Sequence, residues 1–160
     1  MIRLANINDL ENVLEIYSLA REFMKKTGNP TQWGEAYPPK SLVKEDILEE
    51  RLFVLEENNE ILACFVYFEG IEPIYNRIDG AWQDQTPYGV IHRVANGGKT
   101  KGLIKAIKEF ANNKHLRIDT HKDNLVMQHV LEKNGFVKCG TVYLENGEER
   151  WGYEAALRLQ

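Results

Sequence analysis

The spacing of apolar and polar residues changes several times along the chain, and in the first half it predicts two helices and three strands. Apolar residues recur at helical spacing between residues 10 and 24, and Asn8 followed by Glu11 predicts the cap that opens this helix. A proline-rich loop over residues 29–40 precedes a second helix, which is predicted to begin with Ser41 as its cap and to end near residue 50. The strands are predicted over residues 2–5, 52–57 and 61–68.

The second half alternates strands with helices and finishes in a hairpin. The predicted elements, in order, are 88–96, 103–110, 116–120, 125–133, 137–145 and 148–157. Gly135 is placed to end the last helix in a left-handed conformation, and Asn146-Gly147 favours a type I′ hairpin turn. This order indicates an α/β (α+β) fold with a mixed sheet flanked by helices. Strands 89–95 and 116–120 are expected to be parallel, joined by a right-handed crossover.

Composition narrows the class of protein. A chain of 160 residues is the size of one ordinary domain, and we expect residues 1–160 to form a single domain. The net charge of −4 gives no basic field for a nucleic acid, and no apolar run approaches the ~20 residues of a membrane span. Without a signal-like start, and with Cys64 and Cys139 both in apolar strands, a cytoplasmic protein with buried thiols is expected. The histidines and cysteines lack the dense spacing of a metal site, so none is expected.

The glycine- and lysine-rich turn at residues 97–102 carries the clearest chemical signal. It follows an apolar strand and opens a helix at Leu103. Glycines allow backbone N–H groups to turn toward a ligand, and the first helical turn offers unpaired N–H groups at the positive end of its dipole. This combination predicts a seat for a phosphate or diphosphate.

The region from Tyr88 to Gly140 resembles the Gcn5-related N-acetyltransferase (GNAT) superfamily, and the resemblance extends from Ile2 to about Glu154. It is carried by Asn124 and by the run from Leu131 to Phe136, which ends in the family's Gly-Phe pair. The family has Gln/Arg-x-x-Gly-x-Gly/Ala at the glycine-rich turn, and here only the last position matches. The resemblance implies a GNAT-like, mostly antiparallel sheet whose central parallel strands splay apart at the cofactor.

The resemblance also implies a reaction and a set of binding residues. The chain would move an acetyl group from acetyl-CoA to a primary amine, with a small molecule expected as the acceptor, by direct attack on the thioester. Backbone groups of the central strand and the turn would hold the cofactor, and Asn124 would bind its pantetheine arm. The implied cofactor-binding residues are Val94, Ala95, Gly97, Gly98, Lys99, Thr100, Lys101, Gly102, Leu103 and Asn124. A monomer or a homodimer would suit this role.

Proton transfer has no obvious residue. The family often places a tyrosine four residues before the glycine of Gly-Phe, and this chain has Leu131 there. Either another group protonates the leaving thiolate or the thiolate leaves unassisted, which a thiol pKa near 8.5 permits. His92 on the central strand is the candidate base or relay, and Tyr143 is a further candidate; His121 ranks below them, and Cys139 as a covalent nucleophile ranks lower still.

An acceptor pocket would be shaped by the loops 29–40 and 69–88, whose acids and aromatic residues suit a cationic amine. Two alternatives stay open. The chain could be a non-catalytic acyl-CoA-binding module of the same fold. Less favoured is a P-loop-like nucleotide-binding protein, because Gly98-Lys99-Thr100 resembles the end of that motif while Arg93 occupies the place of its leading glycine.

Overall fold

The computed structural model describes residues 1–156, which form two compact units. The first comprises Met1–Tyr67 and His92–Leu103, and the second comprises Phe68–Ile91 and the chain from Ile104 onward. Strand β5 (Gly89–Asn96) begins in the second unit and ends in the first. The predicted organisation as one domain stays a prediction. No helix in this described part of the chain is long and apolar enough to cross a bilayer.

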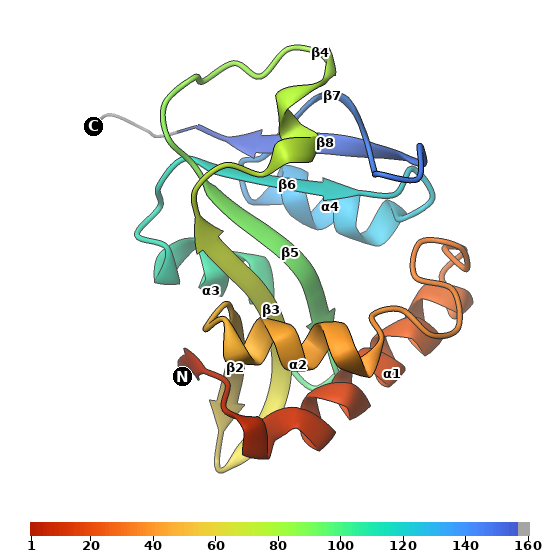
Figure 1. Ribbon diagram of the computed structural model, residues 1–160, viewed down its shortest axis with the longest axis vertical. Coiled ribbons are helices and arrows are strands. Elements are labelled where there is room, and N and C mark those ends of the chain that lie inside the picture. The colour runs from red at the N-terminus through yellow and green to blue at the C-terminus, as the bar shows by residue number, and fades with distance from the viewer. Residues whose placement is uncertain (157–160) are drawn as a thin grey trace. The chain divides into compact units, whose positions relative to one another are not determined.

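The first unit packs two helices on a three-stranded antiparallel sheet. Strand β2 pairs with β1 on one side and with β3 on the other. Figure 1 shows α1 and α2 lying together across these strands, and α2 contacts β2. The core contains the fully buried side chains of Val13, Tyr17, Val43, Leu52 and Phe65. The elements that lie wholly or mainly in this unit are β1 (Ile2–Leu4), η1 (Ile7–Asp9), α1 (Leu10–Lys26), α2 (Lys40–Leu48), β2 (Leu52–Glu57) and β3 (Glu60–Glu69).

The helix caps differ from the predicted ones. Asn6, not Asn8, opens the first helical segment: its side chain accepts a hydrogen bond from the Asn8 N–H at 2.9 Å. The Asp9 carboxylate reciprocates by accepting from the Asn6 N–H at 2.8 Å. This capping box therefore forms on the short 3₁₀ turn that precedes α1, and it begins at Asn6 instead of the predicted Asn8. The predicted cap of α2 was also wrong, because Pro39 rather than Ser41 holds that position.

A charge network beside this cap gives a prediction about acid stability. Arg3 donates to Asp9 at 2.8 Å and to Glu56 at 2.9 Å, and these hydrogen bonds hold the pKa of both carboxyl groups below their ordinary values. A depressed carboxyl pKa stabilises the fold above the unfolded-state value of about 4, and that stabilisation is lost as the pH falls from there through the lowered folded-state pKa. Asp9→Asn should therefore cost about 1–2 kcal/mol at pH 7, after allowing for the solvent access of Arg3, and should cost less at pH 3. Urea unfolding at both pH values tests this, and an equal loss at the two would contradict it.

The second unit carries the parallel strand pair and the C-terminal hairpin. From β5 the strand order is β5-β6-β8-β7-β4; the first pair is parallel and every other pair is antiparallel. The predicted fold class is confirmed: the sheet is mixed and mostly antiparallel, with one parallel pair, and helices flank it. The other elements of this unit are η2 (Pro73–Asn76), β4 (Asp79–Gly80), α3 (Leu103–Phe110), β6 (Leu116–Thr120), α4 (Leu125–Lys133), β7 (Val137–Tyr143) and β8 (Glu149–Ala155).

The parallel pairing between β5 and β6 is short. Gly89 pairs with Leu116 and Val90 with Arg117, whereas β6 continues to Thr120 and stays paired with β8 along its whole length. Within the described residues of the second unit, the ladder between β5 and β6 thus ends after its first two positions. The backbone of β6 beyond Arg117 has its partner strand on the β8 side.

Two predicted turns have different outcomes. Gly135 ends α4 with a φ of +86°, and the Phe136 N–H bonds to the Leu131 carbonyl at 3.0 Å, so the predicted left-handed helix stop is confirmed. The predicted type I′ hairpin turn was wrong, because Gly147 has a positive φ and Asn146 does not. The Gly147 N–H bonds to the Leu144 carbonyl, which fits a type I turn followed by a left-handed glycine.

The long segment before β5 is not a solvated loop. Tyr75 and Trp82 are buried and pack with Val90 and Val142 in one apolar cluster. The indole N–H of Trp82 donates to the Tyr75 carbonyl at 2.8 Å, which ties the segment to itself. The rings of Tyr75 and Trp82 therefore complete the core of the second unit, and the acceptor pocket predicted at the loops 29–40 and 69–88 stays a prediction.

Candidate functional site

The conformation of the glycine-rich turn is fixed by the side chain of Asn96 and by two left-handed glycines. Gly98 and Gly102 have φ values of +93° and +72°, and a Cβ added at either would meet no other atom within 4 Å. Both are glycines because of the backbone conformation and not because of crowding. The Asn96 side chain bridges the turn: it accepts from the Gly98 N–H at 2.8 Å and donates to the Thr100 carbonyl at 2.9 Å. This bridge fixes the conformation before any ligand binds.

The amides that remain available lie in the second part of the turn. The Gly97 N–H donates to the Leu62 carbonyl at 3.0 Å, and a Cβ at Gly97 would lie 2.7 Å from the Ile16 side chain, so this glycine serves packing. No residue of the first unit, which the structure describes completely, accepts a hydrogen bond from the backbone N–H groups of residues 99–103. The available donors are therefore those of Lys99 to Leu103, at the start of α3.

The lysines of the turn have different surroundings. Lys99 pairs with Glu60 through an Nζ–Oε1 distance of 2.6 Å at the surface, which offsets its charge. Lys101 is exposed and has no ion pair among residues 1–156. An anion on this turn would consequently meet one compensated cation and one uncompensated cation beside the backbone donors.

Strand β5 is irregular where it enters the first unit. Arg93 has a φ of +48°, a left-handed conformation that is unusual for an arginine inside a strand. Its guanidinium forms a two-pronged pair with Asp46 of α2, at 3.0 Å and 2.9 Å, and the Tyr17 hydroxyl donates to its carbonyl at 3.3 Å. Asp46 thus fixes the side chain of Arg93, and Tyr17 fixes its backbone carbonyl.

The Asp46 carboxylate is buried beside aromatic rings. Burial raises the pKa of Asp46, while the positive charges of Arg93 and of protonated His92 act in the opposite direction. The Trp33 ring contacts the rings of Tyr17 and Tyr37, with centroids 5.6 Å and 6.2 Å apart. The loop 29–40 thereby packs onto α1 next to the irregular part of β5.

The second unit contributes Asn124 and a carboxylate on β6. Asn124 is the N-cap of α4, and its side-chain oxygen accepts from the Met127 N–H at 3.0 Å. Asp119 lies two positions beyond Arg117, where the ladder with β5 ends, and it accepts a hydrogen bond from the Tyr75 hydroxyl at 2.7 Å. The buried Tyr75 ring therefore fixes one oxygen of this half-buried carboxylate.

Solved structures with the same fold point to one family. An acetyltransferase of the GNAT family from Streptococcus agalactiae 2603 is 29% identical to this chain, and the match covers 100% of this chain and 96% of that one, with a TM-score of 0.87. A protein of Staphylococcus aureus Mu50 described as an acetyltransferase is 26% identical over 99% of each chain, with a TM-score of 0.68. Similarity to these structures over the full length of the chain supports its assignment to the GNAT superfamily.

Other comparisons add to this picture at the level of the fold. The aminoglycoside acetyltransferase AAC(6')-Ib, solved with coenzyme A and kanamycin, is 22% identical and has a TM-score of 0.64 over 99% of this chain and 94% of that one. Sequence comparison alone gives no match, either to models of protein families or to curated proteins. The resemblance inferred from the sequence is confirmed at the level of the superfamily.

The position of the usual GNAT tyrosine holds a fully buried leucine, Leu131. Tyr143 is a poor replacement: its hydroxyl hydrogen-bonds the Asp79 carboxylate, and this bond raises the pKa of Tyr143 above its ordinary value. Burial raises the pKa of Cys139 to about 11, so its thiol stays protonated near neutral pH. The Tyr143 proton is therefore already shared with Asp79, and little Cys139 thiolate is available near neutral pH.

The two histidine candidates differ. Burial lowers the pKa of His121, and its Nδ1 accepts a hydrogen bond from the Asp123 N–H at 3.0 Å in the turn before α4. His92 is half-buried on β5, directly before the irregular Arg93, and interacts electrostatically with Asp46. Of the titratable groups predicted for this GNAT site, His92 is the one that adjoins the irregular strand.

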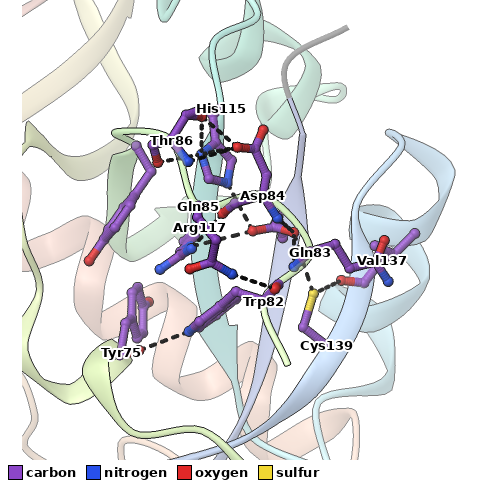
Figure 2. Close-up of polar contacts among 12 residues, drawn as sticks. Tyr75, Trp82, Gln83, Asp84, Gln85, Thr86, His115, Arg117, Val137 and Cys139 are labelled. Atoms are coloured by element: carbon purple, nitrogen blue, oxygen red, sulfur yellow. Dashed lines mark hydrogen bonds and ion pairs between the residues drawn. The ribbon is translucent and has the colours of Figure 1, made fainter. Parts of the chain in front are cut away.

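A buried ionic cluster fixes the chain around residues 82–88. Figure 2 shows Trp82, Asp84 and Thr86 facing His115 and Arg117 of the β6 strand region. The Arg117 guanidinium lies between the rings of Trp82 and Tyr88, 4.3 Å and 4.2 Å from their centroids, and donates to the Asp84 carbonyl. These contacts hold residues 82–88 against β6, and they occupy the Arg117 guanidinium so that it is unavailable to a ligand.

The centre of the cluster is the carboxylate of Glu154 on β8. One oxygen accepts from the N–H groups of Gln83 and Asp84, at 2.9 Å and 3.2 Å. The other lies 2.9 Å from His115 Nε2 and 3.4 Å from Arg117 Nε. The buried negative charge of Glu154 is thus balanced by the buried positive charge of Arg117, because an unpaired charge in a protein interior is costly.

The predicted acidic rim is partly compensated. Glu35 pairs with Lys25 and Glu69 with Lys114, whereas Asp79 and Asp84 accept hydrogen bonds from the hydroxyl groups of Tyr143 and Thr86. The acidic loops therefore present less uncompensated charge to a cationic acceptor than the sequence suggested. Asp119, which the sequence analysis passed over, remains the carboxylate held by an aromatic residue near the end of the parallel ladder.

Proposed function

We propose that this chain is an acetyl-CoA-dependent N-acetyltransferase whose acceptor is a primary amine, with direct attack of the amine on the thioester. The observation that carries the proposal is the open turn, in which the backbone N–H groups of residues 99–103 have no partner in their own unit while Asn96 fixes the turn. Solved members with the same fold supply the reaction class: AAC(6')-Ib has been crystallised with acetyl-CoA and with coenzyme A.

The residues present fit a diphosphate on this turn. Donors at a helix start, two left-handed glycines and the uncompensated Lys101 match an anionic group without a metal ion. Val94 and Ala95 would offer backbone groups to the pantetheine arm and the thioester, and Asn124 would hydrogen-bond the arm. Gly97 and Gly98 would act by shaping the turn, because their own N–H groups already have acceptors.

The chemistry asks three things of the chain. The amine has to lose a proton, for which His92 is the proposed base or relay. The negative charge that grows on the thioester oxygen needs a donor, which a backbone N–H of β5 can supply. The departing thiolate receives no help from Leu131, and a thiol pKa near 8.5 allows it to leave unprotonated.

The decisive experiment measures binding and turnover separately. The protein is incubated with acetyl-CoA and a panel of primary amines, polyamines and aminoglycosides, and free thiol is followed. Release of CoA that depends on an amine, with the acetylated amine detected by mass spectrometry, is expected. Thermal stabilisation by acetyl-CoA without turnover on any acceptor would instead support the non-catalytic acyl-CoA-binding module. If acetyl-CoA neither stabilises the protein nor is turned over with any amine, the proposal is wrong.

Gly102→Val tests the role of the turn. A β-branched residue at a φ of +72° should cost about 1–2 kcal/mol and pull the turn out of shape, which corresponds to roughly tenfold weaker CoA binding. Gly28→Val is the matched control, because Gly28 also has a left-handed φ of +85° with open space around it and lies at the end of α1. Calorimetry should show weakened binding for the Gly102 variant alone; equal affinity in both variants would contradict the assignment.

A further inference from the structure

Arg93 stands apart from the other residues in the left-handed region. Within the described chain, the remaining non-glycine residues with positive φ lie in turns or at helix ends: Glu50, Asn58, Asn59, Asn112 and Asn113. Arg93 instead lies inside β5, where an extended conformation is the rule. Four of the five others are asparagine, the residue that tolerates this conformation best after glycine, and arginine has no such tolerance.

Such a conformation persists only if its surroundings enforce it. Two contacts do so here, both inside the first unit. The two-pronged ion pair with Asp46 fixes the side chain, with N–O distances of 3.0 Å and 2.9 Å, and the buried Tyr17 hydroxyl binds the Arg93 carbonyl at 3.3 Å. Asp46 is 4% exposed, so the pair is largely shielded from water.

Stability alone is a weak reason for this arrangement. A buried ion pair pays desolvation on both partners, and apolar replacements of similar volume are often neutral or stabilising. A left-handed residue within a strand adds a further cost. A local irregularity does have another effect: it changes the orientation of the backbone N–H and C=O groups that follow it in the strand.

We propose that Asp46 and Arg93 are positioning residues that hold this irregularity so that the backbone N–H of Val94 points at the thioester oxygen. The inference rests on the proposed function. Arg93 and Asp46 make no contact with the reacting atoms in this scheme. They act through the strand, by keeping one N–H donor directed before the acetyl group binds, which is the condition for such a donor to stabilise developing charge.

The test removes both charges at once, so that neither partner is left buried and unpaired. Asp46→Asn/Arg93→Gln is compared with Glu11→Gln/Lys40→Gln, which removes an exposed ion pair of the same unit with an N–O distance of 3.3 Å. We expect kcat of the first double variant to fall about tenfold or more, because removing one preorganised donor outright costs about 100- to 1,000-fold and this variant only misdirects it, with CoA affinity within twofold of wild type. The control pair should leave kcat, KM and CoA affinity unchanged.

A spectroscopic readout separates positioning from simple loss of structure. Acetyl-CoA labelled with ¹³C at the carbonyl is bound without an acceptor, and the infrared band of the thioester carbonyl is recorded. A band at lower frequency than in solution is expected for the wild type, returning toward the solution value in Asp46→Asn/Arg93→Gln. Unchanged kcat and an unchanged band in the folded variant would overturn the inference, as would a kcat loss matched by an equal loss of CoA affinity.

The outcomes distinguish this inference from the proposed function. If the wild type binds acetyl-CoA but turns over no amine, the transferase proposal fails while the carbonyl band still tests the positioning role. If the double variant does not fold, Asp46→Asn/Arg93→Gly is used, because glycine adopts a φ of +48° freely, cannot form the ion pair and leaves no buried charge unpaired. A wild-type band in that variant would overturn the inference, and a solution-like band would support it.

Discussion

Replacing Glu154 with alanine is expected to lower the free energy of unfolding by about 3–5 kcal/mol, because it leaves buried charge without its counter-ion. The Glu154 carboxylate is 1% exposed and joins the backbone of Gln83 and Asp84 to the side chains of His115 and Arg117. Its removal unpairs the Arg117 guanidinium and frees the segment that the guanidinium clamps. For a chain of this size the melting temperature should fall by about 6–20 °C.

A matched control is available on the same hairpin. Glu148 pairs with Arg150 at 3.4 Å, but its side chain is 56% exposed, so Glu148→Ala should cost less than about 1 kcal/mol. Urea unfolding gives both values, and hydrogen exchange at Gln83 and Asp84 shows whether the segment is released. A loss below about 1 kcal/mol for Glu154→Ala would mean that the cluster contributes little net stability, contrary to this account.

Replacing His92 with glutamine is expected to lower kcat/KM for the best amine by about 100-fold near neutral pH, the lower end of the contribution of a general base. His92 is the titratable side chain next to the irregular residue of β5, and Leu131 and Tyr143 offer no proton transfer of their own. The rising limb of the pH profile of kcat/KM should also disappear in the variant. Steady-state kinetics across the pH range measures both effects.

Asp119→Asn serves as the comparison. Its carboxylate is oriented by Tyr75 and would attract a cationic acceptor, so this variant should raise KM for the amine and keep the shape of the pH profile. If Asp119→Asn removes the rising limb and His92→Gln leaves it, Asp119 is the base and the assignment of His92 is wrong. Equal profiles in both variants and the wild type would exclude either residue as the base.

Features set by a few neighbouring residues could be predicted from the sequence. The glycine-rich turn before α3, the left-handed stop at Gly135 and the parallel strands on either side of α3 all follow from local patterns with strong preferences. The caps of α1 and α2 were misplaced because several polar residues compete at each helix start. Asn6 prevailed over Asn8 through a reciprocal bond with Asp9 that sequence spacing alone cannot rank.

Features set by tertiary packing could not be predicted. A charged residue in the middle of the apolar strand 88–96 was a signal that Arg93 needs a partner, but nothing in α2 marks Asp46 as that partner. The burial of Trp82 against Arg117 also depends on a contact between distant residues, which the sequence does not reveal. Asp119 gained interest only when the structure placed the Tyr75 hydroxyl on it.

The central claim is that backbone N–H groups of residues 99–103 bind the diphosphate of coenzyme A. Calorimetric titration with CoA and with pantetheine, which has the thiol-bearing arm but no diphosphate, tests it most directly. The account predicts one CoA bound per chain and binding of pantetheine at least tenfold weaker. No measurable affinity for CoA, or equal affinity for the two ligands, would contradict it.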